Sequence, residues 1–299
     1  MKSKNIDGKT ISKVLYSELK NYLLNKKLPT IVDISIGDDY GGLMYAKMKE
    51  KIINQETGIN FKSIHFDKIT YEELIKYLQE LNNDDNINGI MLQLPFPSYL
   101  KDFERNILDT IDPKKDVDGL TTLSAGELMV GKDTFIPCTA LGIETILKAY
   151  NINLTGKTVT IINRSNIVGK PLAQLMLQNN ATPTICHSKT NNLKSITKNS
   201  DIVIAALNKK EAITSEYIKE KTIIIDVGVH KNNEGKTVGD VNFSDVYEKA
   251  SLITPPIGAV GPMTICMLAY NAAKSIYGSE INNLLDNGIK KAKDIINNQ

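Results

Sequence analysis

Short runs of branched apolar residues alternate with helical segments along most of the chain, and this alternation constrains the fold more than any other feature. The runs TIVDISIG (30–37), KSIHF (62–66) and INGIMLQL (87–94) each predict a strand, and segments with helical periodicity separate them. A strand–helix–strand order requires a mostly parallel sheet that is covered by helices. The first part of the chain is therefore predicted to be an α/β domain.

A second series of the same kind follows in the later part of the chain. Its expected strands are 158–163, 182–186, 201–207 and 222–228, with helices after the first two. This order is typical of a Rossmann-like sheet. Between the two series, residues 97–137 carry turn residues and dense charge with only weak periodicity, which predicts a long functional loop.

Composition narrows the class of protein. A chain of 299 residues with 41% hydrophobic content is long enough for two ordinary domains. Its 36 basic residues against 34 acidic ones give no reason to expect a nucleic acid or membrane partner. The three cysteines are widely spaced, so we expect neither a disulfide framework nor a metal site, but a reducing cytoplasm. No apolar run approaches the ~20 residues of a membrane-spanning helix.

The segment IINRSNIVGKP (161–171) follows the first strand of the second series. Such a loop can place backbone N–H groups and a helix N-terminus against a phosphate. Gly169 allows close approach, and Asn163 stands where a tight-turn glycine is usual, since asparagine tolerates positive φ. Only two of the 36 basic residues are arginine, so Arg164 stands out here. The alternative is a turn that binds nothing, with Arg164 capping a helix or paired to a surface acid.

The end of the next strand, CHSK (186–189), bears on the choice of cofactor. It lacks the carboxylate that binds the ribose 2′-hydroxyl in a typical NAD site. Arg164, Ser165 and Ser188 could instead hold a 2′-phosphate if the two loops meet at one edge of the sheet. The sequence therefore favours NADP over NAD.

Four residues of the first series are candidates for chemistry. Tyr45 and Lys49 are one helical turn apart and share a helix face. Gln93 interrupts an apolar run near the carboxyl end of a strand, where parallel sheets bind ligands, and a buried amide needs partners. Asp118 lies in a VDG turn. The alternatives are a solvated lysine at 49 and an ordinary turn residue at 118.

Taken in order, these and other motifs resemble the bifunctional methylenetetrahydrofolate dehydrogenase/cyclohydrolase family over nearly the whole chain. The motifs are Y-x-x-x-K (45–49), G-I-x-x-Q-L-P-x-P (89–97), K-D-V-D-G (115–119), P-C-T (137–139), R-S-x-I-V-G-x-P (164–171), H-S-x-T (187–190), D-V-G (226–228), G-D-V (239–241) and V-G-P-M-T (260–264). Any one of them is weak evidence, but the ordered set is highly specific.

The resemblance implies an α/β protein of two domains with the active-site cleft between them. A discontinuous folate-binding catalytic domain, 1–138 plus 264–299, would be completed by the C-terminal helix. Residues 139–263 would form a Rossmann-like NADP-binding domain, and the usual assembly is a homodimer through that domain.

The implied activity is oxidation of 5,10-methylenetetrahydrofolate by NADP, followed by hydrolysis of the methenyl product to 10-formyltetrahydrofolate for one-carbon metabolism, including purine biosynthesis. By similarity, Lys49 would act in acid–base catalysis, and Gln93 would hydrogen-bond to it and hold its position. Tyr45 would stack on the folate, and Asp118 would accept hydrogen bonds from the pterin.

The resemblance also assigns binding residues. The substrate-binding residues would be Tyr45, Gln93, Asp118, Pro262 and Thr264. The NADP-binding residues would be Thr139, Asn163, Arg164, Ser165, Ile167, Ser188 and Val229. Departures from the family pattern at Asn163, Asn208 and Ile257 leave two alternatives open: an enzyme with cyclohydrolase activity and a weakened dehydrogenase, and a non-catalytic folate- or nucleotide-binding protein.

Overall fold

The computed structural model describes residues 4–38 and 40–298, and these residues form two compact units. The three-stranded unit comprises residues 15–138 and 265–288. The five-stranded unit comprises residues 4–14, 139–264 and 289–298. The predicted two-domain α/β architecture is confirmed. The predicted functional boundaries, 1–138 plus 264–299 and 139–263, stay a prediction, since compactness alone does not define a functional domain.

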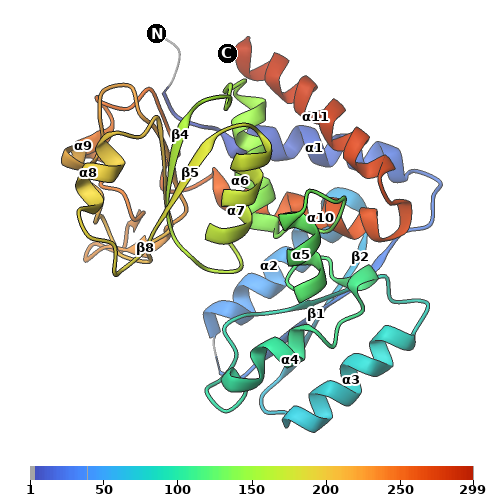
Figure 1. Cartoon of the computed structure of the whole chain (residues 1–299). Coiled ribbons are helices and arrows are strands. Elements are labelled where there is room, and N and C mark those ends of the chain that lie inside the picture. Colours follow the sequence, from blue (N-terminus) through green and yellow to red (C-terminus); the bar gives the residue numbers. More distant parts are fainter. Residues whose placement is uncertain (1–3, 39, 299) are drawn as a thin grey trace. The chain divides into compact units, whose positions relative to one another are not determined.

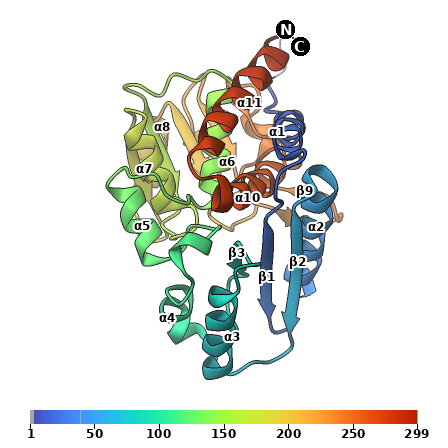
Figure 2. The same cartoon turned by 90° about the vertical axis from the view of Figure 1, so that its right-hand side faces the viewer.

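The three-stranded unit contains a parallel sheet in the order β2-β1-β3. Its strands are β1 (Thr30–Ile36), β2 (Asn60–Phe66) and β3 (Gly89–Leu92). Figure 2 shows β1 and β2 side by side, as their register requires. The central strand β1 is buried along nearly its whole length, as its branched residues predict. Asp33, in the middle of β1, is a charged residue within this otherwise uncharged buried strand.

Helices cover this sheet. They are α2 (Tyr40–Thr57), α3 (Tyr71–Asn83), α4 (Glu104–Leu108) and α5 (Thr122–Met129), with parts of α1 (Gly8–Leu23), α10 (Val260–Tyr277) and α11 (Glu280–Asn297). The start of α3 is fixed by a capping box, in which Thr70 and Glu73 bond each other's backbone N–H groups. Leu74, Leu78 and Leu81 then bury one face of the helix.

The prediction of a continuous loop over 97–137 is wrong, because this segment contains α4 and α5. The helix α4 has only five residues, which is too short to show a period, and burial of Ile107 and Leu108 holds it in place. The helix α5 begins where the side chain of Thr121 accepts a hydrogen bond from the N–H of Ser124.

The five-stranded unit contains a parallel sheet in the order β10-β7-β6-β4-β5. Its strands are β4 (Thr158–Ile162), β5 (Thr182–Cys186), β6 (Ile202–Ala205), β7 (Ile223–Asp226) and β10 (Leu252–Ile253). The strand order reverses between β4 and β6, and ligands of such sheets bind at the carboxyl ends beside that reversal. Asn5 adds a bridge to Ile253 in β10, so the N-terminal segment extends this sheet.

Helices lie on both faces of the five-stranded sheet. They are α6 (Cys138–Ala149), α7 (Gly169–Gln178), α8 (Leu193–Lys198) and α9 (Phe243–Val246), and a hairpin of β8 (His230–Lys231) and β9 (Thr237–Val238) follows β7. Figure 1 shows α6 and α7 on one face, and α8 and α9 on the other. Val203, Ala205 and Ile224 form part of the core on the face of α8 and α9. No helix in the described ranges has the length and apolar character to cross a membrane.

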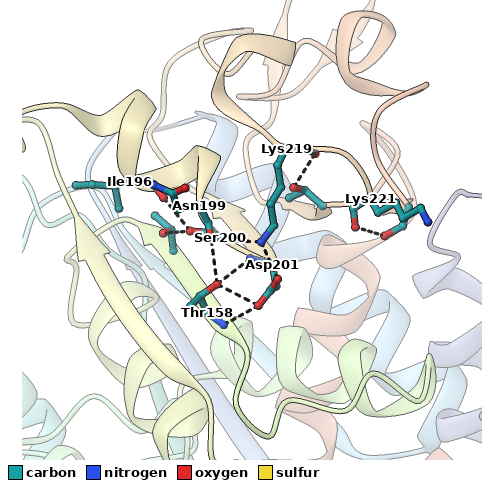
Figure 3. Close-up of polar contacts among 10 residues, drawn as sticks. Thr158, Ile196, Asn199, Ser200, Asp201, Lys219 and Lys221 are labelled. Atoms are coloured by element: carbon teal, nitrogen blue, oxygen red, sulfur yellow. Dashed lines mark hydrogen bonds and ion pairs between the residues drawn. The ribbon is translucent and has the colours of Figure 1, made fainter.

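Hydrogen bonds connect the amino ends of the neighbouring strands β4 and β6 (Figure 3). Asp201 accepts hydrogen bonds from the backbone N–H of Thr158 at 3.0 Å and from its hydroxyl at 3.1 Å. Lys219 donates to the same carboxylate at 2.8 Å, and this lowers the pKa of Asp201 to about 2. These contacts lie at the sheet edge opposite the carboxyl ends, so they stabilise the sheet without occupying the ligand edge.

Candidate active site

The first cluster of candidate residues lies in the three-stranded unit, around Asp33. The Lys49 amine on α2 lies 2.9 Å from Asp33 Oδ2, and the side chains are 2% and 0% exposed. Gln93, just after β3, donates from Nε2 to both carboxylate oxygens of Asp33 at 2.7 Å. In the described chain no direct hydrogen bond joins Gln93 to Lys49, so the expected contact between them is replaced by a shared contact with Asp33.

Tyr45 lies over this cluster, one turn before Lys49 on α2. The Lys49 amine is 5.4 Å from the centre of the Tyr45 ring, as the predicted shared helix face requires. Desolvation raises the pKa of Tyr45 to about 12, and the charges of Asp118 and Asp33 add to this shift. The ring is 36% exposed, and its neighbours Met44 and Met48 are also exposed, so α2 presents an apolar surface beside the buried charges.

The two acids of the K-D-V-D-G motif have different surroundings. Asp116 is buried and accepts hydrogen bonds from the N–H groups of Leu120 and Thr121 and from the Ser124 hydroxyl, so it holds the turn. Asp118 keeps part of its surface exposed, but the protein encloses its carboxyl group, and this desolvation raises its pKa to about 6, although a hydrogen bond from Cys138 and the charge of Lys49 oppose the shift. Asp118 therefore shares the electrostatic environment of Lys49.

Asn271 on α10 fixes the segments around Asp118 from behind. Its side-chain amide donates to the carbonyl of Val117 at 2.8 Å and to the carbonyl of Ile136 at 3.0 Å. Gly119, with φ of +65°, packs so closely that an added Cβ would lie 2.6 Å from the Phe135 carbonyl oxygen. The position of the Asp118 carboxylate is thus set by buried contacts on both sides of it.

The second cluster lies at the carboxyl edge of the five-stranded sheet. The Asn163 side chain spans the reversal point, since its Nδ2 donates to the Ala206 carbonyl at 2.7 Å. Its Oδ1 accepts from the N–H groups of Ser165 at 2.7 Å and Gly169 at 3.1 Å. The turn that contains Ile167 is therefore ordered by Asn163, which replaces the usual glycine without disrupting the entry to α7.

The register of β4 and β5 brings the two predicted phosphate loops together. Ile162 pairs with Cys186, so Arg164 and Ser188 each lie two positions past a paired residue at the same edge. Both are exposed. Among the described residues no carboxylate forms an ion pair with Arg164, so the alternative of a surface salt bridge finds no partner there.

Two buried carboxylates, Asp226 and Asp240, accept hydrogen bonds from the backbone of the neighbouring loops. Asp226 at the end of β7 accepts from the N–H groups of Gly228, Asp240 and Val241, and burial raises its pKa to about 6. Asp240 accepts from the N–H groups of Leu207, Asn208 and Lys209. The D-V-G and G-D-V motifs are thereby explained as one structural unit.

Of the departures from the family pattern, Asn208 keeps the backbone that a glycine would allow, whereas the expectation of a positive φ at Asn163 is wrong, because its side chain organises the turn by hydrogen bonds instead. Asn208 has a φ of +55° and donates its N–H to Asp240. These observations favour an intact nucleotide loop over the weakened one that the substitutions suggested.

The remaining candidates lie where the sheet meets α6 and α10. The Thr264 hydroxyl donates to the Thr139 hydroxyl at 3.3 Å, and Pro262 lies in the first turn of α10. Val229, after β7, is 72% exposed, and Ile257 is 70% exposed. The exposed side chains are available to a ligand, and the Thr139–Thr264 contact joins the starts of two helices.

A parallel sheet with an ordered glycine turn at its reversal point, together with a buried lysine–carboxylate–amide cluster, defines a nucleotide-dependent α/β enzyme. Comparison with known proteins identifies the family to which this chain belongs. Residues 6–118 match the tetrahydrofolate dehydrogenase/cyclohydrolase catalytic domain, and residues 137–279 match the NAD(P)-binding domain of the same family. The chain belongs to the tetrahydrofolate dehydrogenase/cyclohydrolase family, and its function is that of the family, the interconversion of one-carbon derivatives of tetrahydrofolate.

Individual relatives agree with this assignment. The bifunctional protein FolD of Clostridium perfringens is 45% identical over 278 residues, which cover 91% of this chain and 99% of the relative. A crystal structure of the bifunctional FolD enzyme of Campylobacter jejuni superposes with a TM-score of 0.85 at 41% identity, covering 90% of this chain and 97% of that one. The Trypanosoma brucei enzyme, solved with NADP cofactor and inhibitor, gives 0.85 at 29% identity, covering 92% and 98%.

Two site residues were not found from the sequence. Asp33 and Asn271 are buried polar residues inside apolar segments; Asp33 accepts from Gln93, and Asn271 donates to Val117, the residue before Asp118. The signal that could have found them is the one that drew attention to Gln93. A buried polar group must have partners, so its position in an apolar run marks a place where the fold requires a specific contact.

Proposed function

We propose that this protein oxidises 5,10-methylenetetrahydrofolate with NADP and hydrolyses the resulting methenyl cation to 10-formyltetrahydrofolate. The observation that carries this proposal is the buried cluster of Lys49, Asp33 and Gln93 at the carboxyl end of the three-stranded sheet. A fully buried ammonium and carboxylate are costly to keep in a fold, and such groups concentrate at catalytic sites.

In the proposed hydrolysis, water adds its oxygen to the methenyl carbon and releases one proton. The bond from that carbon to N5 then breaks, its electron pair stays on N5, and N5 takes up the proton that the added hydroxyl gives up. Lys49 is the acid–base group beside these proton transfers, and Gln93 takes part in holding it through Asp33. Tyr45 stacks on the folate from the exposed face of α2.

Asp118 accepts hydrogen bonds from the N–H groups of the pterin. With a pKa raised to about 6, it is largely ionised at neutral pH and offers two acceptor oxygens. Pro262 and Thr264, at the start of α10, complete the substrate-binding set. Thr264 is already oriented by its hydrogen bond to Thr139.

The residues of the second cluster fit a dinucleotide. Gly169 is required for the tight turn that presents the start of α7, since an added Cβ would lie 2.1 Å from the Asn163 carbonyl oxygen. Arg164, Ser165 and Ser188 hold the 2′-phosphate, which supports NADP. Thr139, Asn163, Ile167 and Val229 line the remaining contacts. When bound, NADP would supply the hydride acceptor for oxidation of the folate bridge carbon, and the role of the protein would be to align the two, with no acid needed.

The assembly we propose is a cytoplasmic homodimer joined through the five-stranded unit. Among the described residues the edge strand β5 pairs with β4 alone; Ile185 on β5 is 39% exposed, and Leu177 on the adjacent α7 is 58% exposed. The three cysteines are buried and form no disulfide among the described residues, which suits a reducing compartment. Light scattering of the purified protein measures the assembly.

The product, 10-formyltetrahydrofolate, can donate its formyl group, and we propose that it does so in purine biosynthesis.

An assay of the purified protein tests the two activities. NADPH formation from methylenetetrahydrofolate reports oxidation, and loss of methenyl absorbance reports hydrolysis. Lys49→Ala should lower the hydrolysis rate by roughly 100-fold or more, because acid–base catalysis contributes that much. Oxidation should remain measurable.

The matched control is Lys47→Ala, which removes an exposed lysine from the same helix and should leave both rates near those of the wild type. Thermal unfolding checks the Lys49→Ala fold, since that change leaves Asp33 without its charged partner. Equal loss of both activities in a folded variant would contradict the role of Lys49, and absence of either activity in the wild type would refute the proposed function.

A further inference from the structure

Asp33 is an acid in a position that otherwise takes apolar residues. It is 0% exposed in the central strand β1, where it pairs with Ser63 on β2 and Met91 on β3. Its neighbours along the strand, Val32 and Ile34, are buried and apolar. A carboxylate at this place loses its hydration, and it is tolerated only because it is paired and hydrogen-bonded.

Stability of the fold is a poor explanation for this acid. Replacing a buried ion pair by well-packed apolar residues is often neutral or stabilising, so a strand and helix do not need such a pair to pack. The two partners of Asp33 are, moreover, the two side chains to which the hydrolysis was independently assigned, Lys49 and Gln93. The carboxylate thus connects these groups rather than the surrounding core.

The chemistry of an ionised carboxylate fixes how each partner is turned. It accepts hydrogen bonds only, so the Gln93 amide must face it with Nε2, which lies 2.7 Å from both oxygens. The Gln93 carbonyl oxygen is then turned away from Asp33 and is free to accept from another group. The Lys49 amine is held at 2.9 Å by the carboxylate and at 3.6 Å by the Met91 sulfur, below the Tyr45 ring.

We propose that Asp33 is a positioning residue for the hydrolysis step, which sets the place of the Lys49 amine and the orientation of the Gln93 amide through one shared carboxylate. Asp33 itself does not touch the folate. This inference rests on the proposed function of Lys49. Asp33 would act through both Lys49 and Gln93. Hydrolysis should therefore depend on Asp33, whereas oxidation should not, because hydride transfer needs no protein acid.

The test compares both activities of the full-length protein in Asp33→Asn, which keeps the shape of the side chain and removes its charge. The asparagine side chain has only one acceptor oxygen, where the carboxylate has two. It can therefore no longer hold the Gln93 amide and the Lys49 amine at the same time. Hydrolysis kcat should fall at least tenfold, because misplacement of a catalytic group by about 1 Å can cost that much or more. The folate KM and the oxidation kcat should stay within about threefold of the wild type.

Ser35→Ala is the matched control. Ser35 lies two positions along the same strand, is 7% exposed, and makes hydrogen bonds to the Ile64 carbonyl and the His65 ring, away from Lys49. It reports the effect of removing a buried polar group from β1, and its ratio of hydrolysis to oxidation should equal that of the wild type. If Asp33→Asn does not fold, Asp33→Ser, which leaves space for a water, is measured against the same thresholds.

The outcomes separate the two hypotheses. Hydrolysis within twofold of the wild type in the Asp33 variant, or a parallel fall of both activities, would overturn the positioning role. If Lys49→Ala also hydrolyses normally, then the proposed function of Lys49 fails as well. A selective loss in both the Asp33 and Lys49 variants is the result we expect.

Discussion

Arg164 shows how a single side chain can decide between two cofactors. It is exposed at the carboxyl edge of the five-stranded sheet, two positions past β4, beside a strand end that carries no acid. An arginine binds a phosphate through charge-assisted hydrogen bonds, whereas a ribose hydroxyl gives it little to hold. The choice of nucleotide is therefore expected to depend on this residue more than on the rest of the loop.

Arg164→Ala should raise the KM for NADP⁺ by tenfold or more, because charge-assisted hydrogen bonds of roughly 1.5–3 kcal/mol are lost. The KM for NAD⁺ should change by less than about threefold. Initial rates of methylenetetrahydrofolate oxidation with each cofactor measure both. Lys170→Ala is the control, since Lys170 is an exposed cation in the same turn and pairs with Asn166. Similar losses for both cofactors would show that Arg164 does not contact the 2′-phosphate.

The residues of the first cluster differ in how far the sequence could predict them. Tyr45, Lys49 and Asp118 were found by motif, and Gln93 was found because an amide in an apolar run needs partners. The structure brings these four into one environment around Asp33. Asp33 was missed because strand alternation places a polar residue at every second position, so an acid within TIVDISIG looked like the solvent face of a strand.

At the scale of elements, the turn between β4 and α7 combines a strand end, an asparagine bridge and a glycine. Gly169 lies so close to the preceding strand end that an added Cβ would meet the backbone of Asn163 and Arg164. The backbone cannot move away easily, because the Asn163 side chain bonds to both Ser165 and Gly169. The turn is therefore a rigid frame, and it should tolerate little change.

Gly169→Ala should weaken NADP⁺ binding at least tenfold and destabilise the protein by roughly 1–3 kcal/mol, the usual cost of overpacking. Titration with NADP⁺ and urea unfolding measure the two effects. Gly126→Ala in α5 is the control, because its Cβ would meet nothing within 4 Å, and it should stabilise by roughly 1 kcal/mol. Wild-type NADP⁺ affinity in Gly169→Ala would show that the turn is more adaptable than its contacts indicate.

The elements that could be predicted are the long ones with a clear period. The strands β1, β2, β4 and β5 match their predicted ranges closely, and helices lie between the strands of the first series and after β4 and β5, as predicted. The helix α4 and the strand β10 could not be predicted, because five and two residues carry no period of their own. They exist through tertiary contacts, namely the burial of Ile107 and Leu108 and the pairing of β10 with β7.

At the scale of the whole molecule, buried acids make stability depend on pH. Asp118 and Asp226 have pKa values raised to about 6 by burial, above the value of about 4 for an unfolded chain. The folded state then binds more protons than the unfolded state between pH 4 and 6. Their stabilising contribution is complete below pH 4 and is lost as the pH rises through 6. Asp201, with a pKa lowered to about 2, acts in the opposite sense and only below pH 4.

The unfolding free energies of the wild type and Asp118→Asn at pH 5 and pH 7 test this linkage. The difference, wild type minus variant, should be larger at pH 5 by about 1 kcal/mol, because the folded wild type takes up a proton that the variant cannot. Contributions from groups that the two proteins share cancel in this difference. A difference that stays constant, or that falls on acidification, would contradict the raised pKa of Asp118.

The chain passes between the two units at four points, after residues 14, 138, 264 and 288. Neither unit is therefore a continuous stretch of the polypeptide. During synthesis, the β1–β3 sheet emerges from the ribosome well before residues 265–288 complete its unit, and the β4–β10 sheet waits for residues 289–298. Emergence of residues 265–298, rather than the emergence of either sheet, should be the event that permits stable folding.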